Sequence, residues 1–141
     1  MNSLDSIYNT RIIFVIIYLV IDSLYVFNSK DYYKKFIGRV QSKPQNFEKK
    51  GIYSAIGLSY IFLMVGWFIL VSERLSKHST ILDILRITIP YALVVYGVFN
   101  GTLFVMFDKW DVNVSLRDTL WGVTSISILS IIYVQSLKII S

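Results

Sequence analysis

Residues 96–122 read YGVFNGTLFVMFDKWDVNVSLRDTLWG, and this stretch decides the fold. It begins in an apolar run that contains the amide side chain of Asn100, and it then passes through a short charged segment at residues 108–117. A second apolar run opens at Asp118. An apolar run, a tight charged turn and a further apolar run predict two membrane-spanning helices that lie antiparallel to each other.

The rest of the chain has the same character. Of its 141 residues, 55% are hydrophobic, and the mean hydropathy is +0.58; soluble domains are usually about 45–50% apolar. The apolar residues fall into blocks that predict spans at about residues 10–27, 52–71, 88–107 and 118–137. We therefore expect residues 1–141 to form a single all-α integral membrane domain, an antiparallel bundle of four transmembrane helices.

The first apolar block has two interpretations, a cleaved signal peptide or a retained membrane helix. Residues 21–30, IDSLYVFNSK, contain no small-residue cleavage motif, so we expect a retained helix. Residues 31–39 then interleave aromatic and basic side chains. This pattern favours a short basic helix at the headgroup level, ended by Pro44.

Basic residues predict the direction in which the chain crosses the membrane. The connection after the first span holds seven of them: Lys30, Lys34, Lys35, Arg39, Lys43, Lys49 and Lys50. Lys109 and Arg117 fall on the same side, whereas the termini and the second connection carry fewer. The positive-inside rule therefore places the first connection in the cytosol and both termini on the non-cytosolic side.

The basic connection also suggests a lipid contact. We expect Lys30, Lys34, Lys35 and Arg39 to meet lipid headgroups, including those of anionic lipids. The alternative is a topology signal whose lysines extend to the membrane surface without binding a particular lipid.

Strongly polar side chains at membrane depth are costly and usually face the interior of a bundle. Asp22, Asn100 and Asp118 are the residues of this kind, and the predicted topology places them all in the cytosolic half. Helical spacing adds aromatic partners on the same faces, which are Tyr25, Tyr96 and Trp121.

This polar cluster has two interpretations. It can be a small site, open to the cytosol, that holds a proton, a cation or a headgroup. It can instead be a set of helix–helix hydrogen bonds, with Asp118 capping the fourth helix.

Small residues indicate where helices approach closely. Gly97 and Gly101 have the GxxxG spacing, and we expect them to pack against another helix of this bundle, with a dimer as the alternative. Gly122 shares a face with Asp118 and is a third expected packing position.

Several classes of function have no support in the sequence. The chain has no cysteine and one histidine, His78, which excludes disulfides, a Cys nucleophile and a His-cluster metal site. No phosphate-binding glycine loop is visible, and the net charge of +5 reflects one segment between apolar blocks. We expect no catalytic residue, metal, cofactor or nucleic-acid partner, although an enzyme based on two carboxylates stays open.

The chain resembles the small four-helix membrane proteins of the family called domain of unknown function 2177. That family has an L-D-x-x-[WY] element, then Y-G-x-[YF]-D-x-T-N, a loop with Trp, and T-L-x-D-x-x-W-G. The matching stretches here are residues 21–25 (IDSLY), 96–103 (YGVFNGTL), Trp110, and 115–122 (SLRDTLWG). Asn100 and Leu103 depart from the Asp and Asn of the family pattern, which weakens any chemistry that depends on them.

The resemblance implies a multi-pass membrane protein, with members in bacteria and in large DNA viruses, and it brings no established activity. Three functions follow as hypotheses. The first is a non-catalytic structural or scaffolding component, which in a virus would belong to an internal membrane. The second is a small oligomeric transporter or channel subunit that uses Asp22 and Asp118, and the third is a lipid-acting membrane enzyme. The expected partners are the lipid bilayer and further copies of the chain.

Overall fold

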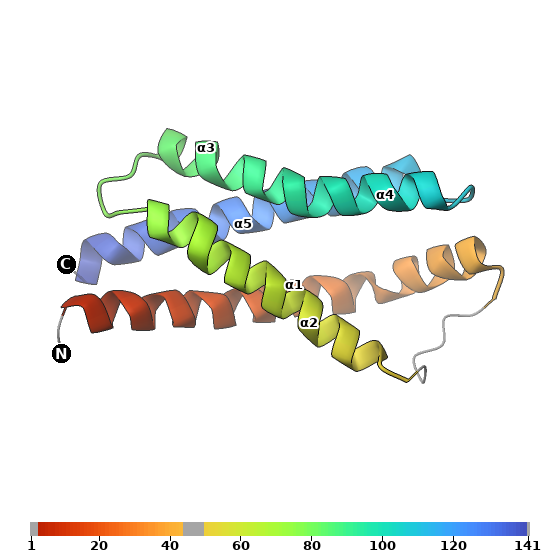
Figure 1. The fold of residues 1–141 in the computed structure, drawn as a ribbon, viewed down its shortest axis with the longest axis horizontal. Coiled ribbons are helices and arrows are strands. Elements are labelled where there is room, and N and C mark those ends of the chain that lie inside the picture. The colour runs from red at the N-terminus through yellow and green to blue at the C-terminus, as the bar shows by residue number, and fades with distance from the viewer. Residues whose placement is uncertain (1–2, 44–49, 141) are drawn as a thin grey trace.

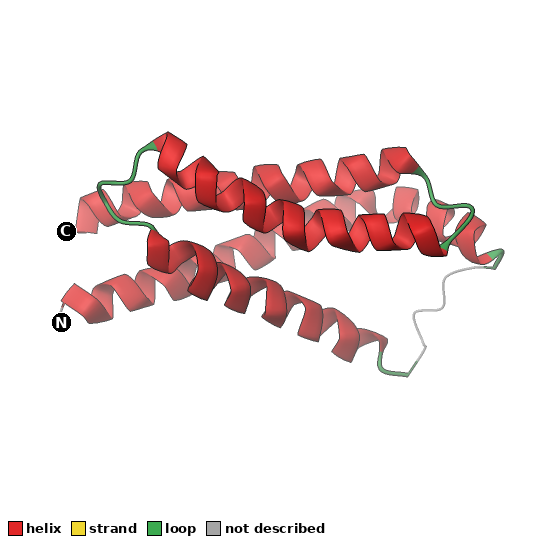
Figure 2. Ribbon diagram, turned by 45° about the horizontal axis from the view of Figure 1, so that its top comes forward, coloured by secondary structure: helices red, strands yellow, loops and turns green. Residues whose placement is uncertain are grey.

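The fold is all-α and contains no strand in the part described by the computed structural model, residues 3–43 and 50–140 (Figures 1 and 2). Its helices are α1 (Ser3–Gln41), α2 (Ile52–Gly66), α3 (Ile81–Ala92), α4 (Val98–Met106) and α5 (Val112–Ile140). Short π-helical and 3-10 segments continue them: η1 (Trp67–Val71), η2 (Ser72–Arg74) and η3 (Leu93–Gly97).

Four helical runs are long and apolar enough to cross a membrane: Ser6–Gln41, Ile52–Arg74, Ile81–Met106 and Val112–Ile140. The predicted four-helix membrane bundle is confirmed. In Figure 1, α1 begins and α5 ends at the same end of the bundle, as an even number of spans requires. Pro44 and Lys49, which the sequence placed in the first connection, lie outside the described residues.

α1 differs from the sequence prediction. The basic segment is not a separate interfacial helix, because residues 31–39 continue α1 without a break. At 1.5 Å per residue its 39 residues extend about 58 Å, well beyond the roughly 30 Å hydrocarbon core. The continuation is held against the bundle: Phe36 is 2% exposed, and its ring meets Trp110 edge-on at 4.9 Å between centroids.

α5 is the most enclosed helix of the bundle, and α1 lies antiparallel to it. Residues taken in order along α1 contact α5 in reverse order, through the pairs Arg11–Tyr133, Asp22–Trp121 and Ser29–Arg117. α5 alternates large apolar residues with serines on its buried faces. Small side chains let neighbouring helices approach closely, which explains the central position of α5.

Several fully buried side chains lie where α5 meets η1 and α3. We call this the Trp67 core, made of Trp67, Thr88, Ser127, Ser130 and Tyr133. Trp67 and Tyr133 are fully buried, with ring centroids 5.5 Å apart in an edge-on contact. The Trp67 indole nitrogen donates to Ser130 Oγ at 3.0 Å, and the hydroxyls of Thr88 and Ser127 lie 3.0 Å apart.

α2 packs through its C-terminal half only. Met64 and, just beyond the helix, Trp67 are buried, whereas in the N-terminal half Tyr53 is 73% and Leu58 is 51% exposed. Accordingly, the Ile52 end of α2 stands apart from the other helices in both ribbon views (Figures 1 and 2). The apolar side chains of this end, Ile56 and Leu58 among them, are exposed.

The third span begins earlier than the predicted residue 88. α3 starts at Ile81, and its start is fixed by a reciprocal capping box: Asp83 N donates to Thr80 Oγ1 at 3.2 Å, and Thr80 N donates to Asp83 Oδ2 at 2.9 Å. Pro90 lies inside α3, and the wider turn η3 follows shortly after it. The missing N–H of Pro90 is accommodated without ending the helical run, which continues to Met106.

Candidate functional site

Asp22 joins three of the four spans. Its Oδ2 accepts a hydrogen bond from the Tyr60 hydroxyl of α2 at 2.6 Å, and its Oδ1 accepts one from the Trp121 indole of α5 at 2.7 Å. The residue is 7% exposed. Both carboxylate oxygens of a buried acid on α1 are therefore engaged by neutral donors from other helices.

Asp118 is bound from α4. The Asn100 amide donates to Asp118 Oδ2 at 2.7 Å and to the Tyr96 backbone oxygen at 2.9 Å, and Asn100 is 2% exposed. The family pattern has an acid where Asn100 stands. An amide here supplies a hydrogen-bond donor to Asp118, which a second carboxyl group could do only when protonated, through its O–H.

The prediction that Asp118 caps the fourth helix is wrong. α5 begins at Val112, so Asp118 is its seventh residue and faces the bundle. The acid at the helix start is Asp111, whose Oδ1 accepts a hydrogen bond from Asn113 N at 2.7 Å. The hydrophobicity pattern missed this because residues 112–117 mix polar and apolar side chains, although an Asp just before a helix is a typical cap.

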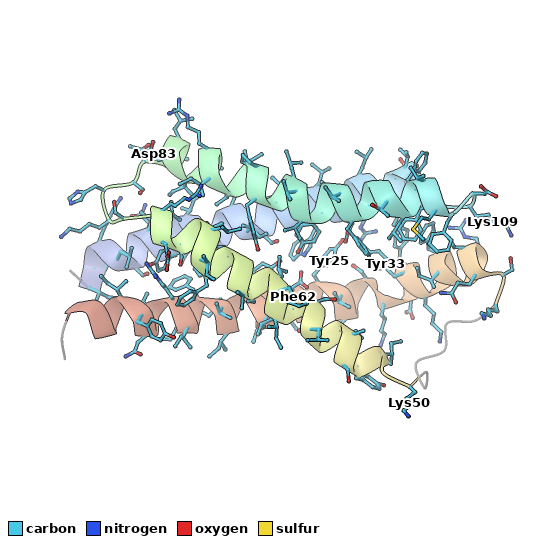
Figure 3. The ribbon with its side chains drawn as sticks, in the orientation of Figure 1. Tyr25, Tyr33, Lys50, Phe62, Asp83 and Lys109 are labelled. Carbon is cyan, nitrogen blue, oxygen red and sulfur yellow. The ribbon has the colours of Figure 1, made fainter. Side chains whose placement is uncertain are left out.

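The aromatic residues expected near the acids do lie with them. Tyr25 stacks on Trp121, with ring centroids 4.0 Å apart and planes 8° from parallel. Tyr96 shares a 2.8 Å hydrogen bond with the Tyr18 hydroxyl, and Tyr25 shares one of 3.2 Å with Tyr33. Figure 3 shows Tyr25 and Tyr33 projecting from α1 toward α4 and α5.

Three tyrosines of this network, Tyr18, Tyr33 and Tyr60, were not among the predicted site residues. Their signal is general: a tyrosine hydroxyl buried in a bundle usually finds a hydrogen-bond partner. That rule does not say which of the ten tyrosines in the chain face inward. Because α2 splays, the residue that reaches Asp22 could be identified only from the structure.

Two cavities adjoin the acids. One, of about 370 Å³, lies beside the splayed half of α2. Its lining includes most of the predicted cluster: Asp22, Tyr25, Val26, Lys30, Tyr33, Ile56, Tyr96, Asp118 and Trp121. The other, of about 380 Å³, is mainly apolar and holds Asn100 and Asp118 in its wall. Tyr33 and Asp118 line both cavities, so the two acids and Asn100 are brought to one region.

The charge of this region is not balanced by an ion pair. Among the described residues, the one salt bridge joins Arg11 and Glu73, near the other end of the bundle. Lys30 lines the first cavity, with its ammonium 4.2 Å from the Phe27 ring centroid. A carboxylate has about four lone-pair sites, so both acids keep acceptor capacity toward the cavity. Chemically, the region can hold a proton or a small cation.

Of the three glycines predicted to lie at helix contacts, Gly122 does so and Gly97 and Gly101 do not. Gly122 packs directly against the Tyr96 ring, and a Cβ there would overlap the ring. Gly97 and Gly101 would meet nothing within 4 Å, so the expected packing of this pair within the bundle is wrong. The reason is helix phase: Tyr96 and Asn100 take the inner face, and each glycine is one residue, about 100° of helix, further round.

The four residues expected to meet lipid headgroups, Lys30, Lys34, Lys35 and Arg39, are exposed along the second half of α1. Arg39 lies over the Phe36 ring at 5.8 Å. Their contact with lipid headgroups stays a prediction.

Comparison with known proteins adds one finding. No curated protein matches the sequence, and no solved structure matches it. A family model described as "Predicted membrane protein (DUF2177)" matches residues 7–134, a range that includes Asp22, Asn100 and Asp118. The match covers nearly the whole four-helix bundle and agrees with the motifs read from the sequence, and on that evidence the chain belongs to the membrane protein family DUF2177.

Proposed function

We propose that this chain is a non-catalytic structural component of a membrane, in which the cluster around Asp22 and Asp118 fixes the helices to one another. The observation that carries the proposal is the double engagement of Asp22. One buried carboxylate accepts hydrogen bonds from α2 and α5 while belonging to α1, at 2.6 and 2.7 Å.

Physical chemistry explains why an acid would serve this role. Helices in a bilayer gain little from the hydrophobic effect when they associate, so packing and interhelical hydrogen bonds carry more of the association. A carboxylate offers several acceptor sites within one short side chain, which lets it accept from two helices at once. An interhelical hydrogen bond matters most for α2, because the N-terminal half of this helix lies apart from the bundle.

The test compares Asp22→Asn and Asp22→Ala in the purified full-length chain. Asn keeps one oxygen acceptor and so retains part of the network, whereas Ala leaves the Tyr60 hydroxyl and the Trp121 N–H without their acceptor. Unfolding midpoints in mixed micelles should fall in the order wild type, Asn, Ala. Equal midpoints for all three proteins would remove the structural role.

A second candidate function is favoured by the cavity that Asp22 and Asp118 both line. A small oligomeric transporter or channel subunit would use such a cavity to bind a proton or cation on its path. Reconstituted vesicles loaded with a pH-sensitive dye, and separately with a K⁺- or Na⁺-sensitive dye, test this directly. A flux that wild-type protein produces and Asp22→Asn abolishes would replace the structural proposal with this one.

A lipid-acting enzyme is the third hypothesis, and it also needs both carboxylates at one substrate. The same vesicles, incubated and then analysed for lipid composition, test it. Turnover of any lipid that depends on Asp118 would establish it, and an unchanged lipid profile would exclude it for the lipids present.

For orientation, the basic residues support a cytosolic first connection and non-cytosolic termini. In Figure 3, Lys50 and Lys109 lie toward the same end of the bundle, and Asp83 lies at the other. Asn113, in the sequence Asn-Val-Ser, provides the test when the chain is expressed with microsomes. We expect no glycosylation there, and modification at Asn113 would reverse the orientation.

A further inference from the structure

The end of the bundle away from Asp118 contains a separate cavity of about 370 Å³. It lies between the start of α1, the linker after η2 and the end of α5. Three basic residues line it: Arg11 from α1, and Lys77 and His78 from the linker. Ser6, Ser76 and Tyr133 also line it, and apolar residues of α1, the linker and α5 complete the lining.

Arg11 is positioned by contacts that leave the N–H groups of its two terminal guanidinium nitrogens free to donate. Its Nε donates to the Tyr133 hydroxyl at 3.2 Å, and its guanidinium lies 5.4 Å from the Phe68 ring centroid. Its Nη1 is 3.8 Å from Glu73 Oε1, which is longer than a hydrogen bond. The Arg11 side chain is 18% exposed and Glu73 is 54% exposed, so the pair is loose on the Glu73 side. The N–H groups at the end of the guanidinium therefore remain available.

The linker that carries the other two basic residues is ordered by its own hydrogen bonds. Ser76 N donates to Ser79 Oγ at 3.0 Å, and Ser79 N returns a bond to the Ser76 carbonyl at 3.0 Å. His78 N donates to Ser76 Oγ at 3.3 Å. This small closed turn fixes the backbone from which Lys77 and His78 extend beside the cavity.

We propose that this cavity binds the phosphate group of an anionic phospholipid in the leaflet at the end where the described chain begins and ends. Arg11 and Lys77 supply two positive charges against the one negative charge of Glu73, and a guanidinium fork matches phosphate oxygens. The apolar side chains of Leu75 and Ile140 in the same lining suit the glycerol and upper acyl carbons. Their presence favours a lipid over a free anion.

The site is distinct from the basic face of α1. Lys30, Lys34 and Lys35 lie along one helix, and Lys30 lines the cavity beside Asp22, whereas Arg11, Lys77 and His78 come from two segments, α1 and the linker, and line one common cavity. Basic pockets between transmembrane helices hold anionic headgroups on the matrix or cytoplasmic side of membranes, and we infer the same chemistry for the leaflet at this end, while exposed lysines interact mainly through the surface potential. The proposal does not depend on the role of Asp22 and Asp118.

The experiment is a lipid titration of the full-length protein in detergent, followed by native mass spectrometry. The probes are phosphatidylglycerol and phosphatidylcholine with the same acyl chains, and inorganic phosphate alone. The variants are Lys77→Gln, the double variant Lys77→Gln/His78→Gln, and the control Arg74→Gln. Arg74 carries the same charge, lies just before the linker and is exposed, but it does not line the cavity.

We expect phosphatidylglycerol to bind more tightly than phosphatidylcholine. Lys77→Gln should weaken its binding by about fivefold, because the variant loses about 1 kcal/mol of direct attraction between the ammonium and the phosphate bound in the cavity. Arg74→Gln should leave this affinity within about twofold. Equal losses for Lys77→Gln and Arg74→Gln, or no preference for the anionic lipid, would overturn the proposal. Displacement of the lipid by inorganic phosphate at equal concentration would overturn the choice of a lipid while keeping a phosphate site.

Arg11→Gln is informative only beside a folding control, because Arg11 also packs on Phe68 and Tyr133. Its unfolding midpoint is therefore measured first. A variant that unfolds like wild type and still loses phosphatidylglycerol binding supports the site. One that unfolds like wild type and binds normally removes Arg11 from it.

Discussion

Two polar regions of this bundle use hydrogen bonds in different ways. The Trp67 core contains only neutral polar groups, and Trp67, Thr88 and Ser130 are fully buried. The region around Asp22 and Asp118 contains two acids and lies beside cavities of about 370 and 380 Å³. The first region joins helices that are already in close contact. The second region includes α2, whose N-terminal half lies apart from the other helices.

The difference shows what each kind of group contributes. A serine hydroxyl is short, so the Trp67–Ser130 bond requires the helices to be close already. A carboxylate accepts from Tyr60 and Trp121 together and reaches a helix that has begun to diverge. If the proposed structural role is right, the neutral hydroxyls and indole of the Trp67 core join helices that already pack closely, and Asp22 compensates for looser packing further along the bundle.

The largest expected effect concerns the contact between α5 and η3. Gly122→Leu would drive a side chain into the Tyr96 ring, and we expect a loss of about 3 kcal/mol in unfolding free energy, the upper range for overpacking. Gly101→Leu is the matched control, since nothing lies within 4 Å of a Cβ there. Equilibrium unfolding in mixed micelles measures both, and similar losses for the two variants would contradict the close approach at Gly122.

Next in size is Asp22→Ala. It leaves two half-buried donors, the Tyr60 hydroxyl and the Trp121 N–H, without their acceptor, at an expected cost of about 2 kcal/mol in unfolding free energy. Asp108→Ala, an exposed acid in the α4–α5 turn, is the control and should change the unfolding free energy by less than about 0.5 kcal/mol. If both variants unfold alike, the acid is not a joint between helices.

A smaller effect is expected in the Trp67 core. Ser130→Ala removes the acceptor of the Trp67 indole, and interhelical hydrogen bonds of this kind average about 0.6 kcal/mol in membrane proteins. Thermal unfolding of wild-type protein and Ser130→Ala in mixed micelles measures the loss in stability. A loss larger than that of Asp22→Ala would reverse the ranking of the two regions.

The smallest effect is predicted for Tyr18→Phe. The change removes one partner of the 2.8 Å hydrogen bond to Tyr96 while keeping the ring that fills the core. We expect a cost of about 0.5 kcal/mol or less in unfolding free energy, because Tyr96 can relax its hydroxyl toward the neighbouring cavity that it lines. A cost above about 2 kcal/mol would mean that this pair, and not Asp22, is the main polar joint of the region.

The residues that the sequence could place, and those it could not, follow from helix geometry. Membrane-length apolar runs are local features, so four spans were predictable, and polar residues at membrane depth pointed to Asp22, Asn100 and Asp118. Which donors reach those acids depends on how helices cross, and no local pattern gave the splay of α2 that brings Tyr60 to Asp22.

Two further differences have the same origin. The spacing of Gly97 and Gly101 correctly placed both glycines on one face of the helix. That face points away from the bundle, because Tyr96 and Asn100 occupy the inner face. The basic half of α1 had the composition of an interfacial helix, yet the Phe36–Trp110 contact holds it in line with the bundle. Composition describes a segment, whereas its partners decide its path.

The most direct test of the central claim is a double-mutant cycle between Asp22→Ala and Trp121→Phe. The Phe variant keeps an aromatic ring beside Tyr25 and removes the indole N–H that donates to Asp22 at 2.7 Å. Unfolding free energies of the four proteins in one micelle composition give the coupling between the two side chains. A structural joint predicts a coupling of about 0.5–2 kcal/mol in favour of the pair. Additive losses, with no coupling, would contradict it.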